Sequence, residues 1–276
     1  MAHALIFAPM ALDAAGVAIT ASATAGGHEA GYVANDHAGV VWKSPTGTAT
    51  RTLTVDLGAD ADIDVAMLFG LDGAQPGWTL TIEAATSAQG SGFGPGDYWS
   101  SGTMPLLGGS EMPVNGRGIA LWQADEELNG VSAPTPARYW RFRIGGLASA
   151  AAVVARLAMG RRLRLERNFS YGAAFGVRDL GNVDFSRGGV MLRQRGARLR
   201  SIGISFASVF KDEVEAQVQP LIEAVGNTGT IALVTDPAAD PMRQRRCWFG
   251  PMVGDVGTIW RSAAGWEWRV NLVSLF

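Results

Sequence analysis

The chain has 276 residues, of which 47% are hydrophobic and 17% are charged, and its formal net charge is −2 at pH 7. This length permits one large or two ordinary domains, and the charged fraction lies below the roughly one quarter of a typical protein. The single cysteine, Cys247, excludes an internal disulfide, and the confinement of histidine to His3, His28 and His37 excludes histidine-based catalysis in the second half.

Charge divides the chain near residue 160. Residues 1–160 hold 7 Lys and Arg against 14 Asp and Glu, whereas residues 161–276 hold 16 against 11. Such asymmetry favours two domains, which we place at 1–160 and 161–276. The 36 glycines and nine tryptophans are typical of a β protein with many turns.

Period-two alternation predicts most of the strands of domain one. It is found in the segments 53–57 and 138–144, and the segments 5–7, 65–69 and 80–84 are also predicted as strands. A turn is predicted at 71–77, a long glycine-rich loop at 90–109, and a last strand at 152–158, where the alanines leave a short helix open. Because long loops on a β scaffold often carry binding sites, we expect any ligand site of this domain in its loops.

Three segments of domain one carry a family resemblance: Trp42-Lys43-Ser44, Leu53-Thr54-Val55-Asp56-Leu57-Gly58 and Arg138-Tyr139-Trp140-Arg141-Phe142-Arg143-Ile144. Over about residues 15–160 the chain resembles the discoidin, or coagulation-factor type C, family. The resemblance implies a galactose-binding-like jelly roll that binds ligands at its loop ends, with Trp42 in its core. Asn35-Asp36-His37 stands where the family carries an Asn-Asp-Gly turn that sometimes helps to hold calcium. Because no cluster of carboxylates is evident in this chain, we expect a turn and no metal.

Aromatic side chains in loops are candidate sugar-binding residues, because an apolar ring can cover the C–H face of a sugar. The candidates in domain one are Trp78, Tyr98, Trp99 and Trp122. A structural role, or a contact with a partner protein, is the other interpretation of these four residues.

Domain two is predicted to combine strands with one helix. Val214, Val218, Leu221, Ile222 and Val225 recur at helical spacing within 211–225. Gly226 follows as a helix C-cap, and Pro220 should kink or divide the helix. Strands are expected at 168–171, 189–192, 202–206, 230–235, 247–249, 260–261 and 266–276.

Ten arginines lie between Arg161 and Arg200, against three acidic residues and no lysine. Nucleic-acid binding is one interpretation, because arginine neutralises phosphates. The arginines alternate with apolar residues, however, and arginine is preferred at protein interfaces. We therefore predict a protein interface or a solvated strand face, with Arg164, Arg193, Arg195 and Arg200 as interface candidates, and no nucleic-acid partner.

Motifs with catalytic spacing are missing from the sequence. It contains no Gly-x-Ser-x-Gly, His-Glu-x-x-His, phosphate-binding Gly-x-x-x-x-Gly-Lys or Cys-x-x-Cys. We therefore expect no enzymatic activity, no cofactor and no metal. No apolar run reaches about 18 residues, so no membrane span is predicted, and residues 1–30 lack the basic start of a signal peptide.

Three segments of domain two carry a second resemblance: Arg167-Asn168-Phe169-Ser170-Tyr171-Gly172, the helix before Gly226-Asn227-Thr228-Gly229, and Gly265-Trp266-Glu267-Trp268-Arg269-Val270. Over about 161–276 the chain resembles the tail-tip proteins of long-tailed bacteriophages. This resemblance implies a small β-barrel or sandwich with one flanking helix, which closes into a ring between the tail tube and the hub.

Together, these observations predict a mainly β chain, with an N-terminal jelly-roll β-sandwich and a C-terminal β domain. We expect a structural tail-tip (distal tail-like) component of a phage or phage-derived virion, synthesised in the host cytoplasm. Its expected partners are the tail tube, the hub and further copies of itself in a hexameric or trimeric ring, with a possible host-surface glycan on the jelly roll. The alternatives are a free carbohydrate-binding module or lectin and, less in keeping with the sequence, a glycan hydrolase with paired carboxylates.

Overall fold

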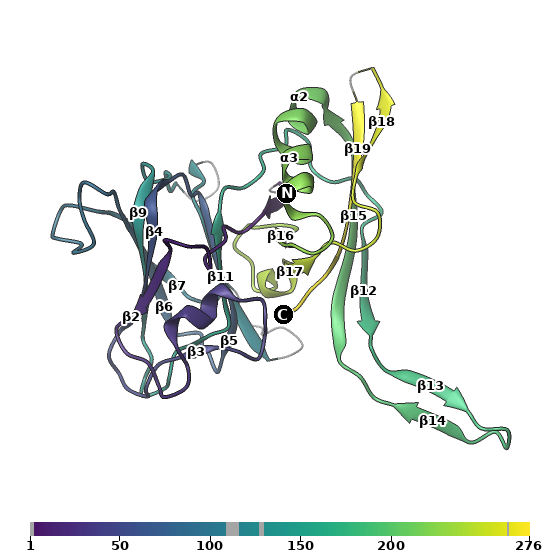
Figure 1. Cartoon of the computed structure of the whole chain (residues 1–276), viewed down its shortest axis with the longest axis horizontal. Helices are drawn as coiled ribbons and strands as arrows, with labels where there is room; N and C mark the ends of the chain where they lie inside the picture. Colours follow the sequence, from purple (N-terminus) through teal and green to yellow (C-terminus); the bar gives the residue numbers. More distant parts are fainter. Residues whose placement is uncertain (1–2, 109–115, 127–129, 264) are drawn as a thin grey trace. The chain divides into compact units, whose positions relative to one another are not determined.

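A computed structural model describes residues 3–108, 116–126, 130–263 and 265–276. The chain divides into two compact units (Figure 1). Unit 1 contains Phe7–Arg162 and Val234–Cys247, and unit 2 contains His3–Ile6, Leu163–Leu233 and Trp248–Phe276. The chain thus leaves the first unit two residues after the position where its charge changes, but later returns one short segment to it.

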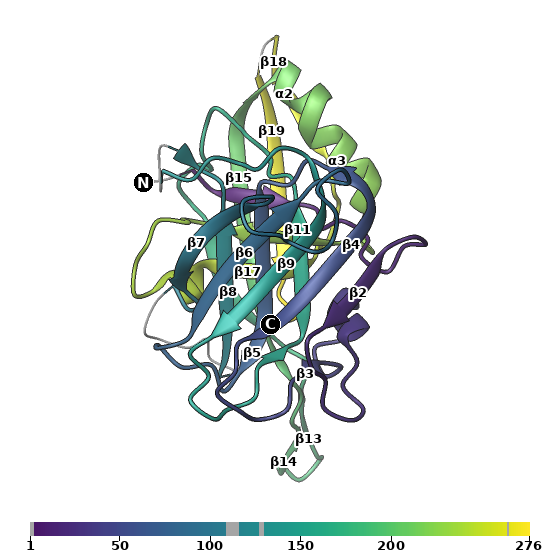
Figure 2. The same ribbon diagram turned by 90° about the vertical axis from the view of Figure 1, so that its left-hand side faces the viewer.

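Unit 1 is a β-sandwich of two antiparallel sheets. The larger sheet has the order β2-β4-β9-β6-β7, and its strands follow one another in Figure 2; their bounds are Ala18–Ala21, Arg51–Ala61, Ala137–Gly145, Thr79–Ala85 and Trp99–Pro105. The smaller sheet has the order β11-β5-β8, with bounds Arg156–Gly160, Val65–Asp72 and Arg117–Gln123. A short pair, β3 (Trp42–Lys43) and β10 (Val153–Val154), and the 3-10 helix η1 (Ala30–Ala34) complete it.

The core of unit 1 follows from the alternation in the sequence. In β9, Trp140, Phe142 and Ile144 are buried, while the residues between them point to the outer face. Leu53 of β4 pairs with Phe142, so two of the segments that resemble the discoidin family are hydrogen-bonded neighbours. Trp42 is fully buried in the same core, where such a ring contributes about 2–3 kcal/mol by leaving water.

Strand β5 differs from β9, because it is apolar and buried on both faces from Val65 to Leu71. A continuous apolar run is the pattern of a strand covered on both sides. Its neighbour β8 is an edge strand, and the buried side chain of Gln244 hydrogen-bonds to its backbone. The Gln244 amide accepts a hydrogen bond from the Ile119 N–H at 2.7 Å and donates one to the Ile119 carbonyl at 2.6 Å. The returning segment, with its 3-10 helix η3 (Arg243–Arg246), is therefore part of this sandwich.

Unit 2 is built on a four-stranded antiparallel sheet in the order β12-β15-β19-β18. The bounds are Ala174–Asp179, Arg198–Phe210, Gly265–Val273 and Thr258–Ser262. A three-stranded sheet has the order β1-β16-β17, with bounds Leu5–Phe7, Thr230–Val234 and Cys247–Pro251. The hairpin β13 (Asn182–Phe185) and β14 (Met191–Gln194) extends from the first sheet (Figure 1).

The predicted helix is present, and its hydrogen-bond pattern widens just before Pro220. It consists of α2 (Lys211–Glu213), a π-helical turn at Val214–Val218 and α3 (Gln219–Val225). The Gln219 N–H donates to the Val214 carbonyl five residues back, and this wider turn directly precedes the proline, which has no N–H to continue an α-helical ladder. Gly226, at φ 56°, ends the helix as predicted.

Three sequence predictions are corrected by the fold. Residues 168–171 form no strand: the Phe169 ring packs against Phe206, with 6.4 Å between ring centroids, so its aromatic character serves packing. The segment 90–109 is not a continuous loop, because β7 crosses it and pairs with β6 through an irregular register between Thr81 and Glu83; residue 109 itself lies outside the described residues. The predicted strand 189–192 begins too early, because residues 187–189 form the hairpin turn and β14 starts at Met191. The other predicted strands overlap observed strands, and 152–158 overlaps β10 and β11 rather than a helix.

The chain is therefore mainly β, with β-sandwich architecture as predicted, and neither unit closes into a barrel within the described ranges. None of the helices described is both long and apolar enough to cross a membrane.

Candidate interaction surfaces

The most exposed part of unit 2 is a protruding segment, residues 174–200, which we call the arm. Strands β12, β13 and β14 are exposed at every position. The hairpin is pinched where Gly181 and Gly196 approach: a Cβ on Gly196 would lie 2.4 Å from the Gly181 nitrogen. The Leu180 N–H donates to the Ala197 carbonyl at 2.9 Å beside this point, so the arm is a continuous hydrogen-bonded structure.

Large apolar side chains cover the arm. Of the 13 large hydrophobic residues that are exposed in the described part of the chain, eight lie on it: Phe175, Val177, Leu180, Val183, Phe185, Val190, Met191 and Leu192. Burying such side chains would contribute about 1.5–3 kcal/mol each. A soluble monomer rarely leaves a contiguous apolar surface of this kind uncovered.

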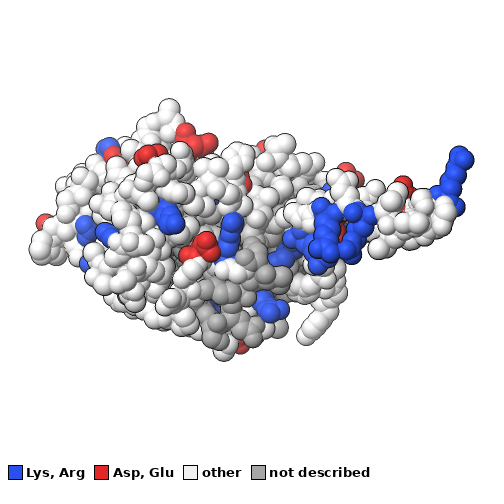
Figure 3. Space-filling view, turned by 90° about the horizontal axis from the view of Figure 1, so that it is seen from below, with Lys and Arg blue, Asp and Glu red and all other residues white. Residues whose placement is uncertain are grey.

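The arm is also basic. It holds six arginines and two aspartates, a balance of +4, and because the whole chain carries −2, the other residues carry −6. Basic side chains gather along the protruding segment in Figure 3. The surface therefore combines apolar area with positive charge, which suits an interface with a negatively charged protein surface.

The four predicted interface arginines fall in different places. Arg193 and Arg195 are exposed on the arm, as an interface role requires. Arg200 is half-buried, with its guanidinium carbon 4.0 Å from the centre of the Trp248 ring, so it stabilises the base of the arm. Arg164 lies in the irregular segment after unit 1, where its N–H donates to Gln217 at 3.0 Å. The structure therefore unites two of the four on one exposed surface.

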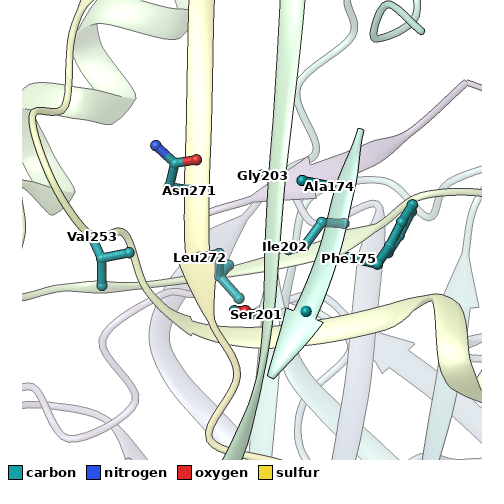
Figure 4. Close-up of a pocket in the computed structure, with 9 residues that line it drawn as sticks. Ala174, Phe175, Ser201, Ile202, Gly203, Val253, Asn271 and Leu272 are labelled. Carbon is teal, nitrogen blue, oxygen red and sulfur yellow. The ribbon is translucent and has the colours of Figure 1, made fainter. Parts of the chain in front are cut away.

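A shallow pocket of about 240 Å³ opens on the sheet at the base of the arm. In Figure 4, Asn271 and Val253 lie on one side of it, and Ala174 and Phe175 on the other. Gly176, Ser201 and Gly203 keep its floor low, because they present little or no side chain. Its lining is mostly apolar, with Ser201 and Asn271 as polar residues, so it could receive an apolar side chain.

Unit 1 presents a different surface on the outer face of its five-stranded sheet. Glu83 of β6 is 1% exposed and pairs with two arginines of β9: Arg141, through its Nε, and Arg143, through an amino nitrogen at 2.9 Å. The Arg141 guanidinium lies over the Phe93 ring at 4.1 Å, and Tyr98 stands edge-on to Phe93 with 5.8 Å between ring centroids. The buried Glu83 carboxylate thus holds the guanidinium groups of Arg141 and Arg143 on this face, and the Arg141 group lies beside the rings of Phe93 and Tyr98.

The predicted sugar-binding aromatics are only partly on the surface. Trp78 and Trp122 are 2% and 3% exposed, so the structure corrects their proposed role: a ring inside the core has no free face for a sugar. Trp99 is half-buried and packs edge-on against Trp122 at 5.4 Å. Tyr98 alone combines partial exposure with polar neighbours on the outer face.

The segment Asn35-Asp36-His37 forms the expected turn: the Asn35 side chain accepts a hydrogen bond from the His37 N–H at 2.7 Å. Asp36 pairs with the buried Arg156 at 3.0 Å, and burial lowers the pKa of that guanidinium. No group of three or more potential metal ligands is found among the described residues. The turn therefore has a structural explanation through Arg156.

One carboxyl group in each unit has a lowered pKa. In unit 1, a hydrogen bond from Arg138 lowers the pKa of Asp56; the two bonds of this pair measure 2.6 and 2.9 Å. In unit 2, hydrogen bonds from Arg269 and then Arg261 lower the pKa of Glu267. In both cases the largest cause of the shift is a hydrogen bond from an arginine, whereas the two acids of a glycosidase would influence each other.

Sequence reasoning missed the Glu83 cluster and the arm, although both left a signal. Arg141 and Arg143 alternate with Phe142, and the preceding predicted strand, 80–84, carries Glu83. This pattern is typical of a charged outer face. Gly188-Gly189 between alternating segments is typical of a hairpin turn.

No protein-family model and no curated protein matches the sequence. Among similar solved structures is a chitosan-binding module from a Paenibacillus sp. IK-5 chitosanase/glucanase. It is 19% identical, with a TM-score of 0.39, and the match covers 53% of this chain and 96% of that module. A family 32 carbohydrate-binding module of Clostridium perfringens NanJ, solved in complex with galactose, is 12% identical with a TM-score of 0.41. That match covers 55% of this chain and 97% of the module.

A Ruminococcus gnavus GH29 fucosidase is similar at 13% identity and TM-score 0.39, with 54% of this chain covering only 26% of that one. The chain thus spans about a quarter of the length of that enzyme. Carbohydrate-binding modules are therefore among the structures that resemble this chain, but likenesses at this level assign no ligand.

Proposed function

We propose that this chain is a non-catalytic structural component of a larger assembly, and that the arm of unit 2 attaches it to a neighbouring subunit. The observation that carries this proposal is the set of eight exposed apolar side chains on the arm. Their burial would supply the driving force for association, and the pinched, hydrogen-bonded base would present them with little ordering cost.

We further propose a second copy of the chain as the neighbour. The charge balance supports this choice, because the arm carries +4 and the rest of the chain −6. An arm that docks on a different surface of the next copy makes a head-to-tail contact, which closes into a ring when the rotation permits. The predicted hexameric or trimeric ring at a phage tail tip, between tube and hub, is the specific assembly that we propose.

Two arm substitutions test the association. Phe185→Ser and Leu192→Ser, made together in the full chain, should shift the oligomer–monomer equilibrium toward monomer by at least about tenfold, because two apolar anchors are lost. Analytical ultracentrifugation over a concentration series measures this shift. Val40→Ser, at one of the two exposed large hydrophobic residues of unit 1, is the matched control. A wild-type chain that stays monomeric throughout the series would refute self-association through the arm.

The tail-tip assignment has its own test. Mass spectrometry of purified virus-like particles from the source should find this chain at a small fixed copy number, such as a multiple of three. Its absence from particles that contain the other tail proteins would reject the assignment while leaving self-association to the previous experiment.

A second candidate function is glycan binding by unit 1, as in a carbohydrate-binding module or lectin. The observation that favours it is the half-exposed Tyr98 beside the Arg141 guanidinium, since an aromatic ring with adjacent hydrogen-bond donors suits a sugar. A glycan array probed with the full chain tests this function. The two functions are compatible, because an assembly component can also attach to a host surface.

A further inference from the structure

We propose that the outer face of the five-stranded sheet in unit 1 binds an acidic saccharide, with Arg143 binding the acid group and Tyr98 packing against the sugar ring. This inference rests on the glycan-binding function proposed above, and it names the ligand class and the site. Arg143 lies on the sheet face, whereas Tyr98 belongs to the segment 90–109, in which the sequence predicted a binding loop.

The first argument is the way in which Arg143 is held. Its guanidinium donates one hydrogen bond to Glu83 at 2.9 Å, while 43% of its side chain remains exposed to solvent. Glu83 is buried and shared with Arg141, so it fixes both guanidinium groups and leaves the cluster with a net charge of +1. An arginine that is oriented from one side and open on the other is prepared to bind a carboxylate or sulfate through its remaining donors.

A second, independent observation is strain in the loop that covers the sheet face. Phe93 has φ 48°, in the left-handed region that bulky side chains rarely adopt. The loop accepts this conformation while the Phe93 ring lies over Arg141 and meets Tyr98 edge-on. Strained backbone of this kind concentrates where a segment positions groups for a ligand.

The neighbouring side chains indicate a sugar rather than an acidic peptide. Thr81 lies directly opposite Arg143 in the strand register, and its hydroxyl is 3.2 Å from that of Thr103. The face therefore offers a cationic fork, an aromatic ring and neighbouring hydroxyls. These are the groups that would recognise the acid, the C–H face and the hydroxyls of one uronic, sialic or sulfated sugar.

A glycan array that carries uronic, sialic and sulfated saccharides beside their neutral parents tests the ligand class with the full chain. Titration calorimetry then compares the best acidic probe with its neutral parent, for instance β-1,4-linked tetramers of glucuronic acid and of glucose. We expect the acidic member to bind about tenfold or more tightly, and its advantage to shrink at high salt, which screens charge.

Variants locate the site. Arg143→Gln should remove the preference for the acidic probe, and Tyr98→Ala should weaken both probes, because the ring contacts the sugar and not its acid group. Arg161→Gln removes an exposed arginine–aspartate pair elsewhere in unit 1 and is the matched control. Since Arg143 pairs with the buried Glu83, thermal unfolding checks that variant, and Tyr98→Ala tests the site without disturbing Glu83.

The outcomes separate the two proposals. Equal binding of acidic and neutral probes would overturn the acidic-saccharide inference and leave glycan binding standing. Binding that neither Arg143→Gln nor Tyr98→Ala changes would overturn the site. No binding to any acidic saccharide would overturn the inference, and no binding to any glycan would overturn the glycan-binding function as well.

Discussion

The two units share an antiparallel β architecture but differ in how many large hydrophobic side chains they expose. Within the described residues, unit 1 exposes two large hydrophobic side chains, Val40 and Met242, whereas unit 2 exposes eleven. Both bury tryptophans completely in their cores, Trp140 in the first and Trp268 in the second. The difference therefore lies in what each unit leaves outside its core.

This contrast concerns the surface that each unit leaves exposed to water. In unit 1, β5 is buried on both faces, and Gln244 forms two hydrogen bonds with Ile119 on the edge strand β8. Unit 2 leaves a hairpin with apolar side chains and unpaired strand edges, which is a liability unless a partner covers it. This difference supports the proposal that a partner covers the arm of unit 2.

The largest expected effect tests whether the buried and exposed aromatics differ in energy as they do in position. Trp140→Ala should destabilise unit 1 by about 3–5 kcal/mol, because it opens a cavity next to Trp122, 6.0 Å away between ring centroids. Trp260→Ala, at a ring 67% exposed in unit 2, should cost at most about 1 kcal/mol. Urea denaturation measures both, and equal losses would contradict the comparison.

A smaller effect is expected at the pinch of the arm. Gly196→Ala places a methyl group 2.4 Å from the Gly181 nitrogen, so the backbone must shift, at a cost of about 1–3 kcal/mol. Hydrogen exchange should show loss of protection at the Leu180 amide, while the core of β15 keeps its protection. Gly188→Ala meets only the Ser186 hydroxyl at 3.8 Å and serves as the control. Unchanged protection at Leu180 would show that the arm is held by other contacts.

The sequence predicted most of the sheet scaffold because burial imposes a period. Trp266, Trp268, Val270 and Leu272 alternate with polar residues, and β19 shows the same alternation. The helix stripe from Val214 to Val225 was equally readable, because both ends of the helix carry clear signals. The predicted strand at 168–171 failed because the apolar character of Phe169 arises from a ring contact rather than from strand pairing.

The candidate surfaces were harder to predict, because they depend on which strands become neighbours. Glu83 and Arg141 are 58 residues apart, and only the β6–β9 register brings them together. The same reasoning explains the error at Trp122: its sequence neighbours do not reveal that it lies between Trp99 and Trp140 in the core. Arg193 and Arg195 could be found by alternation alone, since a hairpin is a local structure.

The smallest expected effect concerns an ion pair, and it tests whether ion pairs, rather than apolar surface, distinguish the two units. Asp56 has a lowered pKa in the folded state, so its stabilisation is present above the unfolded pKa near 4 and is lost as the pH falls through the folded pKa. Asp56→Asn should therefore cost about 0.5–1 kcal/mol at pH 7, because the pair with Arg138 is bidentate but about one-third exposed. The cost should shrink as the pH falls through the folded pKa.

Urea midpoints for wild type and variant between pH 7 and pH 3 measure this convergence. Asp62→Asn, which removes the more exposed pair with Arg161, is the control and should show a smaller difference at pH 7. A difference for Asp56→Asn that persists unchanged into acid would refute the linkage. Because Glu267 in unit 2 also has a lowered pKa, both units should lose a small charge contribution in acid. That result would leave the exposed apolar arm as the feature that sets unit 2 apart.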